Sequence, residues 1–165
     1  MRGQVLSRGD PLALAAEDFP AAQKVLTAVQ GKEPLAAELR DVLLAQQEVQ
    51  QKMPGTNLAA LESRLAGLHP ANRLLAHYWL GEWHVQRVGA SGDGTGLRDA
   101  ALDFLAVAAL AEDRDPELAA AGLYHALQIL DKLKDTAAAS AVRRELLGRY
   151  RETAQGKRAA ELERP

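Results

Sequence analysis

Hydrophobic residues recur every three or four positions along most of the chain, the spacing of one face of an α-helix. Two clear stripes are Leu58, Leu61, Leu65 and Leu68, and Leu123, Leu127, Leu130 and Leu133. The pattern predicts eight helical segments, followed by a short tail helix. Their ranges are 10–18, 20–30, 34–52, 57–67, 71–88, 97–112, 116–133 and 136–150, and the tail helix is expected at 154–163.

Proline and aspartate mark several predicted helix starts and ends. Asp115-Pro116 places a capping side chain before a proline, which fits the first helical turn. Pro34 also suits a helix start, whereas Met53-Pro54-Gly55 predicts a helix end. The short connections make consecutive helices antiparallel neighbours.

Composition supports an all-α fold. The 165 residues include 32 alanines and 27 leucines, both strong helix formers, and aromatic residues make up only 4%. This length fits one domain with its own core. Because alanine dominates, we expect helices that approach closely.

Other features of the composition exclude several classes of protein. Without cysteine, the chain forms no disulfide, thiolate zinc site or iron–sulfur cluster. A net charge of −2 gives no reason to expect nucleic acid or an anionic membrane as partner. The longest apolar run, 105–111, is shorter than the ~20 residues of a transmembrane helix, and residues 1–10 do not resemble a signal peptide. We therefore expect a soluble protein, cytoplasmic or periplasmic.

A spacing near 39 residues relates four segments. Alanines that open a second helix occur at Ala22, Ala60, Ala100 and Ala139, with spacings of 38, 40 and 39. This period matches two helices and two turns, so it predicts stacked helix pairs.

The second half carries a motif as well as a period. Leu80-Gly81, Ala100 with Phe104, and Pro116 match the pattern of a tetratricopeptide repeat, although His77 and His84 occupy its Trp and Tyr slots. The chain thus resembles helical-repeat proteins of the bacterial tetratricopeptide type. The resemblance implies a short right-handed α-solenoid, and it places Gly81 where the first helix of the repeat crosses its partner.

The resemblance also divides the single domain, 1–165, into parts. Residues 10–69 form degenerate helix pairs, 70–151 form tetratricopeptide-like repeats, and 152–165 form a tail or capping helix. In that family the first helices line a concave groove that binds a peptide or partner helix. The corresponding slots are Tyr78, Glu82, Gln86, Tyr124, Gln128 and Lys132. The alternative is an ordinary solvent-exposed face without a ligand.

Catalysis and cofactors are not expected. His77 and His84 share a helix face but are separated by about 10.5 Å along the axis, too far to share a metal ion. No G-x-S-x-G motif is present, and acidic residues near 112–115 suit helix capping. The glycine-rich segment 89–96 follows a predicted helix rather than a strand, so it predicts a surface loop and not a phosphate-binding cradle.

Three further interpretations remain open at this stage. The chain could be an assembly module that self-associates, because segment 20–30 exposes an apolar stripe unless something covers it. Trp79 and Trp83 predict a helix–helix contact, with the 89–96 loop as one neighbour, or an exposed hot spot. Basic residues of the last third form a solvated face or bind an acidic protein or RNA; they are Arg143, Arg144, Arg149, Arg151, Lys157 and Arg158.

Overall fold

The computed structural model describes residues 34–91, 94–111 and 114–161, and these contain seven α-helices, one 3₁₀ helix and no strand. The all-α prediction is therefore confirmed. The elements are α3 (Pro34–Gln50), α4 (Thr56–Glu62), the 3₁₀ helix Leu65–Gly67, α5 (Pro70–Ser91), α6 (Gly94–Ala111), α7 (Pro116–Lys132), α8 (Thr136–Arg149) and α9 (Ala154–Glu161). The segments expected at 10–18 and 20–30 lie outside the described residues.

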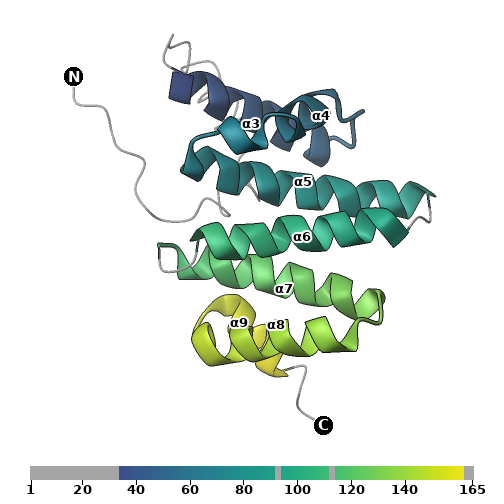
Figure 1. The fold of residues 1–165 in the computed structure, drawn as a ribbon, viewed down its shortest axis with the longest axis vertical. Helices are drawn as coiled ribbons and strands as arrows, with labels where there is room; N and C mark the ends of the chain where they lie inside the picture. The colour runs from purple at the N-terminus through teal and green to yellow at the C-terminus, as the bar shows by residue number, and fades with distance from the viewer. Residues whose placement is uncertain (1–33, 92–93, 112–113, 162–165) are drawn as a thin grey trace.

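The helices follow one another in space in the order of the chain (Figure 1). The most extensive contacts join α5 to α6 and α6 to α7. On one side α3 and α4 pack against α5, and on the other α8 and α9 pack against α7. Helix α6 is therefore the central layer, with a neighbour on each side.

The last three helices begin at caps supplied by the residue just before them. Asp115 accepts a hydrogen bond from the Leu118 amide at 3.0 Å, and Asp135 accepts one from the Ala138 amide at 3.0 Å. The Thr153 hydroxyl oxygen accepts one from the Gly156 amide at 3.0 Å. Each cap satisfies a helical N–H group that has no partner within its helix.

Carboxylates from α3 also contact the starts of α4 and α5, although the His69 ring gives α5 a local cap as well, accepting from the Ala71 amide at 3.4 Å. Glu48, which is buried, accepts hydrogen bonds from the backbone amides of Asn57 and Leu58 and from the Asn57 side chain, at 2.8 to 3.1 Å. Glu38 accepts from the His69 amide at 2.9 Å. The two carboxylates come from nine or more residues away, so local sequence patterns do not reveal them.

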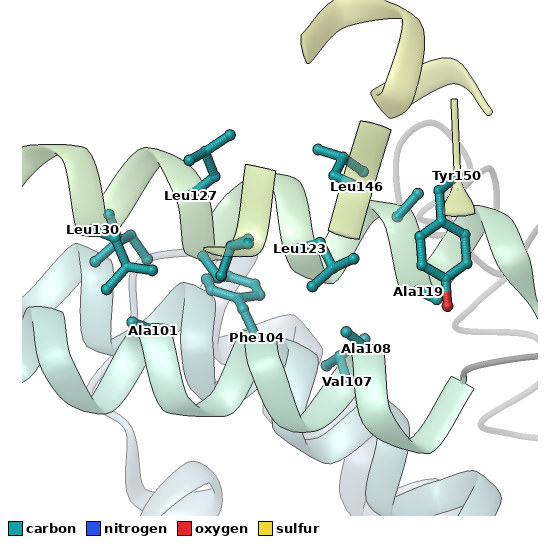
Figure 2. Close-up of a cluster of buried hydrophobic side chains, with 14 of the residues drawn as sticks. Ala101, Phe104, Val107, Ala108, Ala119, Leu123, Leu127, Leu130, Leu146 and Tyr150 are labelled. Atoms are coloured by element: carbon teal, nitrogen blue, oxygen red, sulfur yellow. The ribbon is translucent and has the colours of Figure 1, made fainter. Parts of the chain in front are cut away.

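Two hydrophobic clusters form the core. The N-terminal cluster joins α3, α4 and α5 through Val42, Ala45, Val49, Leu58, Leu61, Leu68, Ala76, Trp79 and Leu80. The C-terminal cluster joins α6 to α9 and includes Phe104, Val107, Leu123, Leu127, Leu146, Tyr150 and many alanines (Figure 2). Tyr78 of α5 packs against both, so the two clusters meet at this side chain.

Glycines mark the closest helix crossings, as expected for Gly81. A Cβ atom at Gly81 would lie 2.9 Å from the Phe104 ring, and one at Gly122 would lie 2.6 Å from the Phe104 carbonyl oxygen. Phe104 is fully buried, so neither position has free space. The α5–α6 and α6–α7 crossings therefore both depend on glycine opposite Phe104.

The loop predicted at 89–96 is too long, because most of these residues belong to helices. Helix α5 continues to Ser91 and α6 begins at Gly94. A Cβ atom at Gly96 would lie 2.7 Å from Val88 Cγ2. Close packing against Val88 thus offsets the ~1 kcal/mol that Gly96 costs the helix.

The two tryptophans face the N-terminal helices. Trp79 is buried in the N-terminal cluster, which confirms a helix–helix contact. The Trp83 ring lies against Gly55, and the Arg87 guanidinium lies 4.7 Å from the ring centroid. The observed neighbour of Trp83 is therefore the α3–α4 connection.

Candidate functional site

The six predicted groove residues lie on α5 and α7, and they differ in exposure. Tyr78, Glu82 and Tyr124 are half-buried, whereas Gln86, Gln128 and Lys132 are exposed. The half-buried residues occupy the middle of the two helices. The exposed residues follow one or two turns later, toward the helix ends.

His125 of α7 brings the half-buried residues of both helices together. Its ring centroid lies 6.0 Å from that of Tyr78 and 6.4 Å from that of Tyr124, edge to face in both cases. Glu82 Oε1 lies 3.9 Å from His125 Nδ1. We call Tyr78, Glu82, Tyr124 and His125 the α5–α7 face. Although α5 and α7 are separated in sequence by α6, their side chains form one surface.

The remaining predicted residues do not join this surface. The Gln86 side chain donates a hydrogen bond to the Val49 carbonyl oxygen of α3 at 3.2 Å, so it helps to hold α5 against the N-terminal helices. Gln128 and Lys132 continue along α7 beyond the site. The structure thus brings three of the six residues around His125, which the sequence analysis did not select.

A buried aromatic side chain supports the α5–α7 face from below. The Phe104 ring of α6 stacks on the His125 ring, with centroids 4.8 Å apart and planes at 18°. It also contacts the Tyr78 ring edge to face, at 5.8 Å. Because Phe104 is held against Gly81 and Gly122, it gives the face a rigid floor.

Burial shifts the titration of three side chains on this face. Burial raises the pKa of Glu82 and lowers the pKa of His125. It also raises the pKa of Tyr78 to about 12, with the negative charge of Glu82 as a second cause. At neutral pH the imidazole and the phenol are therefore uncharged, and His125 offers Glu82 no positive charge.

A second polar cluster lies between α5 and α6. Asp103 of α6 bridges two histidines of α5: its Oδ1 lies 2.8 Å from His77 Nδ1 and its Oδ2 lies 2.9 Å from His84 Nδ1. The side chains are 13%, 19% and 9% exposed for Asp103, His77 and His84. One carboxylate thus spans the two-turn separation between the histidines and ties the helices together.

Charge and hydrogen bonding reinforce each other in this cluster. The hydrogen bond with Asp103 raises the pKa of His84 although burial opposes it. Burial would raise the pKa of Asp103, but the hydrogen bonds with His77 and His84 outweigh burial and hold it below its ordinary value. Glu62 of α4 lies 3.8 Å from His84 Nε2, on the far side of the imidazole. The arrangement favours a protonated imidazole between two carboxylates.

This cluster could not be predicted from the sequence because its carboxylate lies far from both histidines along the chain. Asp103 is 26 positions from His77 and 19 from His84, so only the pairing of α5 with α6 brings them together. Across the described ranges, no three His, Asp or Glu side chains are placed to hold a metal ion. The geometry is that of a structural link between helices.

The fold and site define an all-helical chain of successively packed helices with an aromatic and acidic face. Comparisons with protein-family models, curated proteins and solved structures found no match to this chain. In the part that the structure describes, no helix combines the length and apolar character needed to cross a bilayer.

Proposed function

We propose that this protein is a non-catalytic protein–protein interaction module that binds a peptide or partner helix on the α5–α7 face. In this proposal the helix pairs form a short right-handed solenoid like that of tetratricopeptide repeats, and α5 and α7 are the first helices of successive repeats. The contact of Tyr78 and Glu82 with His125 carries the proposal, because it unites two non-consecutive helices in one surface.

The composition of this face suits recognition. It combines half-buried aromatic rings with polar groups, and Gln128 and Lys132 are exposed further along α7. Tyrosine and other aromatic residues are enriched where proteins bind one another, since they bury a large area with few rotatable bonds. The rigid floor at Phe104 reduces the entropy lost when a partner binds.

Self-association through terminal helices is the alternative function. The large hydrophobic side chains that are most exposed within the described part are Leu35, Met53 and Leu102. They lie on α3, on the α3–α4 connection and on α6, so they belong to three different elements. Among the described residues, these side chains thus give no single element an apolar surface of its own.

Selection from a random-peptide display library against the full-length protein tests the proposal. Recovered peptides are expected to bind saturably and to lose at least about tenfold in affinity to a Tyr124→Ala variant, as interface aromatics typically do. The matched control is Leu102→Ala, which removes a side chain that is 65% exposed on α6. This variant should bind like the original protein, and circular dichroism should show both variants folded.

Two results would overturn the proposal. One is the absence of any saturable peptide, together with concentration-dependent dimerisation in light scattering, which would favour the assembly module. The other is a set of peptides that bind Tyr124→Ala and the unchanged protein equally well, since the binding surface would then lie elsewhere.

A further inference from the structure

Glu82 differs from Asp103, Asp41 and Asp131 in how its charge is balanced. Asp103 is held by two imidazoles, Asp41 lies 2.7 Å from the Arg64 guanidinium, and Asp131 lies 3.2 Å from that of Arg143. Glu82 is 29% exposed, and within the described residues its closest basic group is His125, at 3.9 Å. Because burial keeps that imidazole neutral, the Glu82 charge is half-buried without a compensating charge from the described helices.

The surroundings of Glu82 favour a cation. The rings of Tyr78 and Tyr124 flank His125 on the same face, and aromatic rings attract a cation that lies over them. Burial and the Glu82 charge both keep the Tyr78 phenol protonated, so it adds no second negative charge. One carboxylate beside aromatic rings suits an ammonium or guanidinium group with an apolar stem, whereas a divalent metal ion needs more ligands.

We propose that Glu82, with Tyr78, Tyr124 and His125 around it, receives a lysine or arginine side chain of the bound peptide. This inference rests on the proposed function, since it names the partner of the same face. The charge of the bound side chain compensates Glu82, while its alkyl stem packs against the tyrosine rings. The exposed Gln128 amide, further along α7, is available to hydrogen-bond the peptide backbone.

The test combines a variant of the protein with a variant of the peptide. Peptides recovered from the display library are synthesised with each lysine replaced by norleucine and each arginine by citrulline, which remove the charge and keep the shape. Full-length protein and a Glu82→Gln variant are titrated with both forms. We expect Glu82→Gln to weaken the charged peptide about tenfold and to leave the uncharged peptide nearly unchanged.

Glu145→Gln on α8 is the matched control, because it makes the same change at an exposed carboxylate away from this face. It should leave both affinities unchanged. Glu82→Gln should also keep or raise the melting temperature of the free protein, since it removes an uncompensated, half-buried charge. If Glu82 had a purely structural role, Glu82→Gln would lower the melting temperature instead, and that outcome would contradict the inference.

The possible failures are distinguishable. If peptides bind and lose affinity on Tyr124→Ala but respond equally to Glu82→Gln in their charged and uncharged forms, the cation inference fails and the proposed function stands. The same holds if the recovered peptides share no basic residue. If no peptide binds at this face, the proposed function fails, and the inference fails with it.

Discussion

The helices of the N-terminal and C-terminal clusters are capped and packed in different ways. In the N-terminal cluster, two helices begin at carboxylates supplied by α3, and a tryptophan fills part of the core. In the C-terminal cluster, α7, α8 and α9 each begin at a cap formed by the residue just before the helix. Alanine and glycine allow these helices to approach closely. The first region depends on contacts distant in sequence and the second on local signals.

This difference predicts how each region responds to mutation. Where helices touch through their backbones, one added methyl group has no space, so small substitutions cause the largest losses. Where a distant carboxylate caps a helix, removing it breaks tertiary and secondary structure together. Local caps affect mainly their own helix.

The largest effect is expected for Gly122→Ala in the C-terminal region. The new Cβ atom would lie 2.6 Å from the Phe104 carbonyl oxygen and 3.1 Å from the Ala108 amide nitrogen, and backbone atoms cannot move aside without displacing α6. We expect a loss of about 2 to 3 kcal/mol in the free energy of unfolding, measured by urea denaturation.

Gly148→Ala is the control for that substitution. It lies in α8, and a Cβ atom there would meet nothing within 4 Å, so it should stabilise the protein by roughly 0.5–1 kcal/mol. Equal effects of the two variants would show that the α6–α7 crossing is not as close as described.

A smaller loss is expected when Glu48 is replaced by alanine. The Asn57 and Leu58 amides would lose their acceptor, and Leu58 is buried, which should cost about 2 kcal/mol. Asp135→Ala, which removes a local cap, should cost only about 1 kcal/mol. If urea denaturation shows the local cap to be the more costly loss, the contrast between the two regions is wrong.

The smallest expected effect is the change of stability with pH, which has opposite signs for His84 and His125. The folded-state pKa of His84 is raised, chiefly by its hydrogen bond with Asp103, so its stabilisation is complete below the unfolded pKa of about 6.5 and is lost as pH rises through the folded value. Burial lowers the folded-state pKa of His125, so acidification through about pH 6.5 costs stability there.

Substitution of each histidine separates the two contributions. The difference in unfolding free energy between the unchanged protein and His84→Asn should shrink from about pH 6 to about pH 8. The difference between the unchanged protein and His125→Asn should grow over the same interval. Differences that do not change with pH would show that neither imidazole titrates differently in the folded state.

Much of the helical pattern was predictable from the sequence because its signals are local. Asp115 with Pro116, and Pro34, mark helix starts where the structure places them, and Gly81 lies at a close crossing as expected. The loop predicted at 89–96 was too long, since α5 continues to Ser91 and α6 begins at Gly94, and Gly96 packs closely against Val88. Local propensity could not reveal a tertiary contact that outweighs it.

The site was less predictable, because it depends on which helices become neighbours. Helical spacing alone aligns Tyr78 with Glu82 on α5, but it does not reveal that His125 of α7 lies near both. For the same reason, the sequence does not show that His77 and His84 share a carboxylate, or that Glu48 caps a helix. Partners separated by tens of residues leave no periodic signal in a single sequence.

The location of both tryptophans in α5 has an optical consequence. The chain contains two tryptophans, and both contact the N-terminal helices, whereas the C-terminal cluster contains none. Tryptophan emission therefore reports the opening of the N-terminal region, while far-ultraviolet ellipticity sums over every helix. Tyr78 packs against both clusters, so it couples their unfolding across α5. The two signals coincide during denaturation only as long as that coupling makes the whole stack a single cooperative unit.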